Sequence, residues 1–315
     1  MDTKYANKIT LQLNKIVKDN VISNAYIFYG PENIGKKETA LRFIEEIIRT
    51  NNSDLDPYPK IKDNNYPDYL RIEPTYLLKG NLINQSEIDK EKNQITKPLI
   101  RIEQIRKIKL FLSKRSIQST KKFILIENAH LLNESSSNGL LKTLEEPTNG
   151  VFILLTSKLN LLLDTIISRS QIIRFKPYSS QELKKLIEKF AHKNTDLLSD
   201  SEVLENLIFI SNGSPGKLID NLKVWNQIPE NIKYEIKFPL KNYKNILILA
   251  KNIASDLDLN QQEFLLNYMQ RNCWQRSKDK RKVEILESIK NNINSNIQAR
   301  ISWEVGLLKL KLENS

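Results

Sequence analysis

The chain has 315 residues, of which 40% are hydrophobic and 27% charged, a composition typical of a folded globular protein and not of a disordered one. Its formal net charge is +12, from 49 basic and 37 acidic residues. This excess favours polyanionic partners, nucleic acid first, unless it only reflects a Lys- and Asn-rich composition. The only cysteine is Cys273, which excludes an internal disulfide and a four-cysteine zinc site.

The length leaves room for two or three domains. The first ten residues are polar and lack a signal-peptide hydrophobic region, and no apolar stretch is long enough to span a membrane. We therefore expect a cytoplasmic protein that does not associate with membranes.

A phosphate-loop motif follows a first predicted helix, which is marked by apolar positions at residues 9–17. Residues 25–29 predict a buried strand and residues 38–49 a helix. The loop between them places Gly30, Gly35 and Lys36 in the pattern G-x-x-x-x-G-K. In this pattern backbone N–H groups wrap phosphates and the lysine reaches their charge.

The residue after the motif lysine departs from a working site. Such a site has Ser or Thr there, whose hydroxyl holds Mg²⁺, whereas this chain has Lys37. An ammonium group cannot ligate a cation and repels one. The loop is therefore predicted to be a degenerate relic that keeps its shape. Weak ATP binding without hydrolysis is the alternative.

The next segment has few strong signals. Residues 51–65 predict a loop or small insertion, residues 69–72 a strand, and residues 77–97 an extended polar surface segment. Isoleucines at helical spacing predict a helix that opens near Ile100. Four basic residues flank its end, and we assign them to solvated surface rather than to DNA contact: Lys114, Arg115, Lys121 and Lys122.

A second strand ends in an acidic residue. Residues 123–126 form an apolar run typical of a strand buried on both faces of a parallel sheet, with Glu127 at its carboxyl edge. A working ATPase has Asp followed by Glu here, whereas this chain has Glu127 and Asn128. An amide cannot accept a proton, so Asn128 cannot serve as the general base that activates water for ATP hydrolysis. We expect His130 to be a packed or capping residue and not a metal ligand.

A helix that Pro147 stops and a strand at residues 151–155 come next. They lead to a polar turn formed by Ser168, Arg169 and Ser170. An arginine on a short turn at a domain edge can reach a neighbour's nucleotide site, where its planar fork neutralises charge on the transferred phosphoryl group. By position alone, a surface ion pair is the expected role of Arg169.

The remainder is helical after a last short strand at residues 172–175 and a capped helix start at residues 179–182. Residues 212–217 interrupt the helical pattern, and four amphipathic helices are predicted between residues 246 and 312. The basic cluster at residues 276–282 is assigned to a solvated helix junction rather than to nucleic-acid contact.

Several of these segments together resemble the delta-prime family of bacterial DNA polymerase III clamp-loader subunits. The resemblance covers about the first 220 residues and, more loosely, the helical tail. It is carried by residues 25–31 (AYIFYGP), 67–68 (PD), 102–106 (IEQIR), 138–147 (NGLLKTLEEP) and 165–171 (TIISRSQ).

The resemblance implies an α/β fold: an AAA+ P-loop parallel-sheet module at residues 1–177, a helical lid at 178–237 and an all-α C-terminal collar at 238–315. The collar would assemble a ring with motor subunits of the gamma/tau type and a delta-type subunit. That ring loads a sliding clamp on primed DNA.

In this family the delta-prime subunit does not hydrolyse ATP and lends an arginine to the adjacent motor. That role falls on Arg169, with Ser170 where the family motif has cysteine. Many members carry a four-cysteine zinc module, but residues 51–65 contain no cysteine, so we expect no zinc and no other metal or cofactor.

Two further hypotheses stay open at this point. The chain could be an active clamp-loader ATPase that uses Lys36 and Glu127, or a basic DNA-binding regulator on a degenerate P-loop scaffold. In the favoured interpretation it is no ATPase by itself, although it belongs to the DNA polymerase III holoenzyme.

Overall fold

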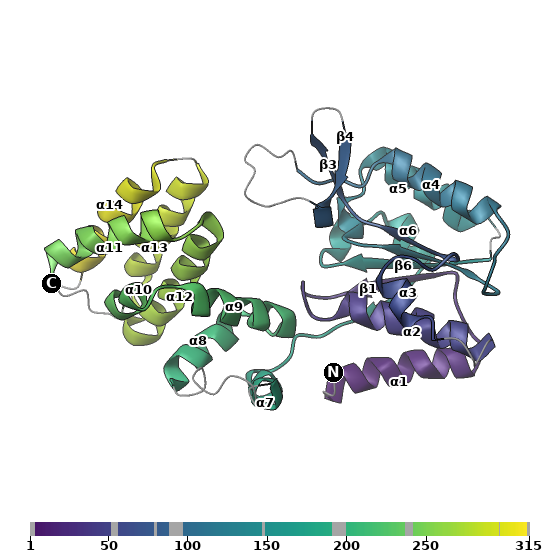
Figure 1. The fold of residues 1–315 in the computed structure, drawn as a ribbon, viewed down its shortest axis with the longest axis horizontal. Helices are drawn as coiled ribbons and strands as arrows, with labels where there is room; N and C mark the ends of the chain where they lie inside the picture. The colour runs from purple at the N-terminus through teal and green to yellow at the C-terminus, as the bar shows by residue number, and fades with distance from the viewer. Residues whose placement is uncertain are drawn as a thin grey trace. The chain divides into compact units, whose positions relative to one another are not determined.

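The computed structural model describes residues 4–51, 56–78, 81–87, 97–146, 149–190, 200–236, 242–295 and 297–313. The chain divides into two compact units, Met1–Pro177 and Tyr178–Ser315 (Figure 1). The expected boundary between lid and collar at residues 237 and 238 lies outside the described residues, as does Pro147, the expected stop of a helix.

The first unit is built on a five-stranded parallel sheet with the strand order β2-β5-β6-β1-β7. The strands are β1 (Ala25–Tyr29), β2 (Tyr69–Ile72), β5 (Lys122–Ile126), β6 (Gly150–Thr156) and β7 (Gln171–Arg174). The chain leaves β1 toward one edge of the sheet and leaves β6 toward the other. The carboxyl ends of β1 and β6 therefore form a topological switch point, where open α/β sheets bind ligands.

Helices cover both faces of this sheet (Figure 1). On one side lie α1 (Lys4–Lys18), α2 (Lys36–Asn51) and α3 (Tyr58–Lys62); on the other lie α4 (Ile102–Ser113), α5 (Glu134–Glu145) and α6 (Asp164–Ser168). The turns η2 (Ala129–Leu131) and η3 (Leu159–Leu161) follow β5 and β6.

The central strands are buried on both faces because their side chains alternate between two cores. In β1, Ile27 belongs to the core that also contains Ile105 of α4 and Leu140 of α5. Tyr26 points the other way, and its ring lies 5.2 Å from that of Phe43 in α2. The predicted strands at residues 25–29 and 69–72 are confirmed to the residue, and the other predicted strands to within two residues.

The first prediction that the structure corrects concerns the segment after β2. Residues 77–97 were expected to be an extended surface segment, but β3 (Thr75–Leu78) pairs with β4 (Asn81–Asn84) in an antiparallel hairpin, followed by η1 (Gln85–Glu87). Apolar residues face each other across it, since Leu77 lies opposite Leu82. The rest of that prediction, residues 88–96, lies outside the described residues.

A second correction concerns Lys122, which was expected at a solvated surface. Its side chain is buried, and its ammonium group donates to the carbonyls of Phe111 and Lys114. Lys114 and Arg115 are exposed as expected. Lys122 therefore holds the end of α4 against the start of β5.

The second unit consists of helices in its described part. They are α7 (Ser180–Phe190), α8 (Ser201–Ile210), α9 (Pro215–Gln227), α10 (Glu230–Glu235), α11 (Tyr243–Asp256), α12 (Leu259–Ser277), α13 (Lys280–Asn294) and α14 (Ala299–Leu312). The basic cluster does form a helix junction, because Lys278 caps α12 in a left-handed conformation and Asp279 caps α13. It is not solvated throughout, since Lys282 is buried. Among the described helices of both units, none is long and apolar enough to cross a membrane.

Candidate functional site

The phosphate loop connects β1 to α2 at the switch point of the sheet. Gly35 has a φ of 100°, which favours glycine. Gly30 is required for another reason, because a Cβ there would collide with the backbone oxygen and Cβ of Phe175. The glycines of the motif are thus explained by the fold of the loop and by its packing against the residue after β7.

The motif lysine is directed into its own loop. Lys36 Nζ donates to the carbonyl oxygens of Gly30 and Pro31, both at 2.6 Å, and the residue is only 9% exposed. Burial lowers the pKa of the Lys36 ammonium group to about 8, although the negative charge of Glu32 opposes the shift. Two of the three ammonium donors are therefore used by the loop and not directed toward a ligand.

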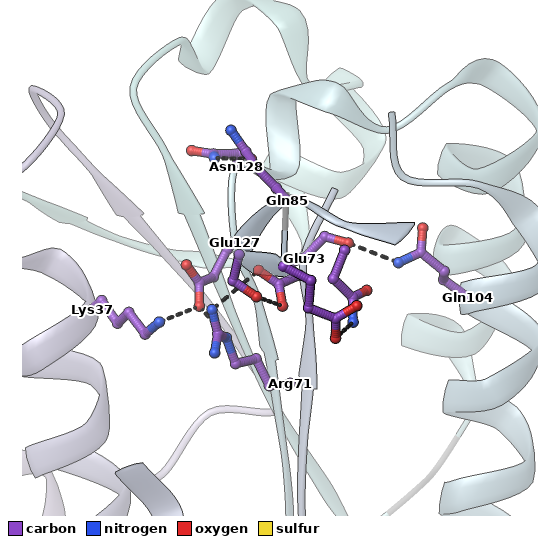
Figure 2. A network of polar contacts seen from close by, with 10 residues as sticks. Lys37, Arg71, Glu73, Gln85, Gln104, Glu127 and Asn128 are labelled. Atoms are coloured by element: carbon purple, nitrogen blue, oxygen red, sulfur yellow. Dashed lines mark hydrogen bonds and ion pairs between the residues drawn. The ribbon is translucent and has the colours of Figure 1, made fainter. Parts of the chain in front are cut away.

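Lys37 forms an ion pair at the point where a working site binds magnesium. Its Nζ lies 2.8 Å from Oε1 of Glu127, the acid that follows β5 (Figure 2). The same oxygen accepts a hydrogen bond from Nε of Arg71, which reaches it from β2. One carboxylate oxygen is thus held between two side-chain cations.

The cluster continues toward the hairpin through Glu73. Arg71 Nη2 lies 3.2 Å from Glu73 Oε2, and Ser86 Oγ donates to Glu73 Oε1 at 2.7 Å. The backbone carbonyl of Glu73 accepts from Nε2 of Gln104 in α4 at 2.7 Å (Figure 2). Residues from β2, α2, α4 and η1 and the acid that follows β5 therefore meet in one network.

A magnesium–nucleotide complex does not fit these residues. The position of the magnesium-binding hydroxyl holds an ammonium group, the acid is neutralised by two cations, and the motif lysine is bonded to its own loop. Among the described residues, no group of three His, Cys, Asp or Glu side chains could hold a metal ion.

Asn128 is the other departure from a working site. It has a left-handed backbone with a φ of 48°, and its amide donates to Oε1 of Gln85 at 3.5 Å. The nearby His130 is partly buried and interacts through Nδ1 with Thr156 Oγ1 at 3.2 Å. Burial, helped by the charge of Lys158, lowers the pKa of His130. This partly buried position is that of a packed residue, as expected for His130.

Arg169 lies away from this cluster, at the C-cap of α6. Its side chain is 42% exposed. Nη2 lies 2.8 Å from Oε1 of Glu145, the last residue of α5, and Nη1 donates to the carbonyl of Thr165 at 3.1 Å. Ser168 is exposed and Ser170 half-buried. The polar turn predicted after Ile167 is therefore present, and it presents an arginine at the surface.

The structure thus brings together Gly30, Gly35, Lys36, Lys37 and Glu127, with Asn128 beside them, and keeps Arg169 separate. Sequence reasoning missed Arg71 and Glu73. The available signal was a charged residue, Arg71, inside a short strand whose neighbours are apolar. The contact with Glu127 depends on β2 lying next to β5, and their spacing in the sequence does not reveal that.

Fold and site together define the class of protein: a parallel-sheet module with a P-loop-type turn, in which two side-chain cations pair with the acid after β5, followed by a helical C-terminal unit. A family model described as "DNA polymerase III, delta subunit" matches residues 5–179. Another, described as "Cyanobacterial DNA polymerase III delta prime, C-terminal domain", matches residues 181–310. The chain belongs to the DNA polymerase III delta-prime subunit family, as the sequence motifs indicated.

Curated relatives carry the same names. The chain is similar to DNA polymerase III subunit delta' of Bacillus subtilis, with 29% identity over 187 residues, covering 57% of this chain and 50% of the relative. It is similar to subunit delta' of Pseudomonas aeruginosa, with 28% identity over 201 residues, covering 61% of this chain and 54% of that one. The matches thus span about half the length of these relatives.

Similarity to solved structures is weaker. A DNA polymerase III gamma subunit-related protein of Thermotoga maritima is 18% identical with a TM-score of 0.46, over 96% of this chain and 98% of that one. A RuvB branch migration motor of the same organism is 15% identical with a TM-score of 0.44, over 93% and 81%.

Proposed function

We propose that this chain is a non-hydrolysing subunit of a cytoplasmic DNA polymerase III clamp loader, and that it supplies Arg169 in trans to the nucleotide site of an adjacent motor subunit. Its partners would be gamma/tau-type and delta-type subunits, with the sliding clamp and primed DNA bound through the complex. In this role the chain needs a rigid shape and an accessible arginine but no ATPase activity of its own.

The observation that carries the first half of the proposal is the neutralised acid. Glu127 pairs with both Lys37 and Arg71, so it has no free charge for a metal ion. Asn128 is a second departure from an ATPase site, because an asparagine cannot polarise water as a glutamate would. These features favour a non-hydrolysing subunit over an ATPase motor subunit.

The exposure of Arg169 supports the second half. The ion pair with Glu145 joins two side chains that are 42% and 47% exposed. Such surface pairs contribute only about 0–1 kcal/mol. A desolvated phosphate of a neighbouring subunit can therefore replace Glu145 at little cost, whereas the bond from Arg169 to Thr165 would keep the guanidinium oriented.

An ATPase assay on the reconstituted ring tests this function. Replacing Arg169 by alanine should leave ring assembly intact and strongly reduce clamp- and DNA-stimulated hydrolysis at the adjacent motor, since arginine fingers are worth about 10³–10⁵ in rate. Arg169→Lys should restore little, because a lysine keeps the charge but loses the planar fork.

The matched control is Arg115→Ala, which removes an exposed arginine from the loop after α4. It should leave the ATPase rate unchanged. Wild-type hydrolysis by the Arg169→Ala ring would contradict the trans role. Magnesium-dependent turnover by the isolated chain would favour the motor hypothesis. Salt-sensitive duplex binding without affinity for clamp-loader subunits would favour the DNA-binding regulator.

A further inference from the structure

We propose that Lys37 and Arg71 replace the divalent cation of a P-loop site. Their side chains would hold α2, the helix after the phosphate loop, against Glu127 at the end of β5 in the absence of nucleotide. Arg71 is the new element in this inference. It would act as a positioning residue that keeps Glu127 paired, and so unavailable to a metal ion, even when Lys37 is removed. The inference holds whether or not Arg169 acts on a neighbouring subunit.

The bonding pattern supports this replacement. A divalent cation in a P-loop site is held by the residue after the motif lysine and by the acid of a neighbouring strand. Here Lys37 occupies the first position and Glu127 the second, and they are joined directly at 2.8 Å. A fixed cation therefore makes the link between α2 and β5 that a metal makes elsewhere.

The charges of the cluster are balanced. Lys37 and Arg71 contribute two positive charges, and Glu127 and Glu73 two negative ones (Figure 2). A cation in the first turn of a helix is unfavourable, and Lys37 lies in the first turn of α2. The carboxylate of Glu127 beside it relieves that conflict, so the two departures from a working site compensate each other.

Because Arg71 is the more buried of the two cations, its ion pair with Glu127 contributes more than that of Lys37. The side chains of Arg71, Glu127 and Glu73 are 20%, 19% and 13% exposed, whereas that of Lys37 is 41% exposed. Screening by water weakens the more exposed pair, while an unpaired charge at the more buried position is costly. Arg71 also bonds both carboxylates, so it holds Glu127 even when Lys37 is absent.

This arrangement predicts that a metal site cannot be restored by one substitution. Lys37→Thr supplies the missing hydroxyl but leaves Arg71 between the two carboxylates. The double variant Lys37→Thr/Arg71→Met frees Glu127 and Glu73 together and keeps the packing of the arginine stem. Carboxylate and hydroxyl oxygens are the ligands that hard divalent cations prefer.

Binding of Mn²⁺ to the full chain, measured by electron paramagnetic resonance, tests the proposal. The double variant should bind Mn²⁺ at least about tenfold more tightly than the wild type, whereas Lys37→Thr should stay within about twofold of it; a tenfold difference corresponds to roughly 1.4 kcal/mol. The control is Lys60→Thr/Arg115→Ala, which removes the same charges from exposed positions. Equal binding by Lys37→Thr and the double variant would overturn the role of Arg71. A double variant no better than the wild type would overturn the replacement.

Thermal unfolding gives a readout that does not require the double variant to fold. Glu127→Gln removes the shared carboxylate, and we expect it to lower the unfolding midpoint of the full chain by roughly 2–4 °C or more. Arg71→Met should lower the midpoint more than Lys37→Thr. EDTA should leave the wild-type midpoint unchanged. An unchanged midpoint in Glu127→Gln would also overturn the proposal.

Discussion

Asp68 illustrates at the scale of single residues how a family motif can have a structural purpose. It lies in the Pro67-Asp68 pair that precedes β2, and its carboxylate is fully buried. It accepts hydrogen bonds from the backbone N–H groups of Ile117, Gln118 and Ser119 at 2.7–3.0 Å. It therefore organises the loop between α4 and β5, the strand that ends just before Glu127.

Removing this charge should destabilise the protein in a pH-dependent way. Burial acts to raise the pKa of Asp68, but the three backbone donors and the Ser119 hydroxyl outweigh it, so the pKa is lowered. A lowered carboxyl pKa stabilises the fold above the unfolded value of about 4, and this stability is lost as the pH falls through the folded value. We expect Asp68→Asn to cost about 2–4 kcal/mol at neutral pH.

Urea unfolding of both proteins between neutral pH and pH 3 checks this expectation. The wild type should lose stability more steeply in acid than Asp68→Asn, so the two curves converge. Parallel curves would show that the carboxylate charge is not what stabilises the loop. Asp56→Asn is a suitable control, because Asp56 is exposed at the surface.

Single positions differ in how far the sequence reveals them. Lys37 and Asn128 could be recognised because their departures lie at fixed places within a motif. Arg71 could not, because its partner is 56 residues away and reaches it only through the pairing of β2 with β5. Lys122 was misassigned because a lysine beside other basic residues resembles surface, while its ammonium group is bonded to two carbonyls.

At the scale of elements, apolar pattern and length predicted most of the fold. Short apolar runs gave the buried strands, and isoleucines at helical spacing gave α4. The hairpin β3–β4 was missed because its alternation is weak: each strand has four residues, and asparagines begin and end β4. A two-stranded sheet of this kind is marginal on its own. Here Ser86 of η1 bonds the side chain of Glu73, the residue that follows β2 of the main sheet.

Close helix packing in the second unit leads to a prediction about Gly306. A Cβ at this position of α14 would overlap the buried side chain of Ile289 in α13. Gly306→Ala should gain about 1 kcal/mol of helix propensity but lose about 1–3 kcal/mol to overpacking, so we expect a net loss of roughly 1 kcal/mol. Ile289→Val in the same chain should recover part of that loss.

Gly139→Ala is the matched comparison, in α5 of the first unit. Its Cβ would come too close only to the flexible end of Ile102, at 2.9 Å from Cδ1, because the next atom, Cγ2 of Ile105, lies at an ordinary contact distance of 3.4 Å. The gain in helix propensity should nearly balance that contact, so stability should change little. Chemical denaturation of the single and double variants measures both effects. Gly306→Ala no worse than Gly139→Ala would contradict the packing argument.

At the scale of the whole molecule, the ion pairs and hydrogen bonds at the phosphate loop predict a chain whose stability does not respond to nucleotide. A ligand that binds only the native state raises its stability by RT ln(1 + [L]/Kd), which is about 2.7 kcal/mol at a hundredfold excess over Kd. Even weak binding would therefore be visible at millimolar ATP. The groups that would meet phosphate and metal are engaged by the protein, since Lys36 bonds its loop and Lys37 bonds Glu127.

We therefore expect the unfolding midpoint of the full chain to stay constant in ATP with magnesium, in ATP with EDTA and in buffer alone, as measured by scanning fluorimetry. The three conditions separate the hypotheses left open by the sequence. A rise with ATP in both magnesium and EDTA would mean that the degenerate loop still binds phosphates without metal. A rise that requires magnesium would mean that Glu127 can exchange its side-chain cations for a metal ion, as an active motor needs. A constant midpoint leaves Arg169 as the group through which this chain could take part in ATP hydrolysis.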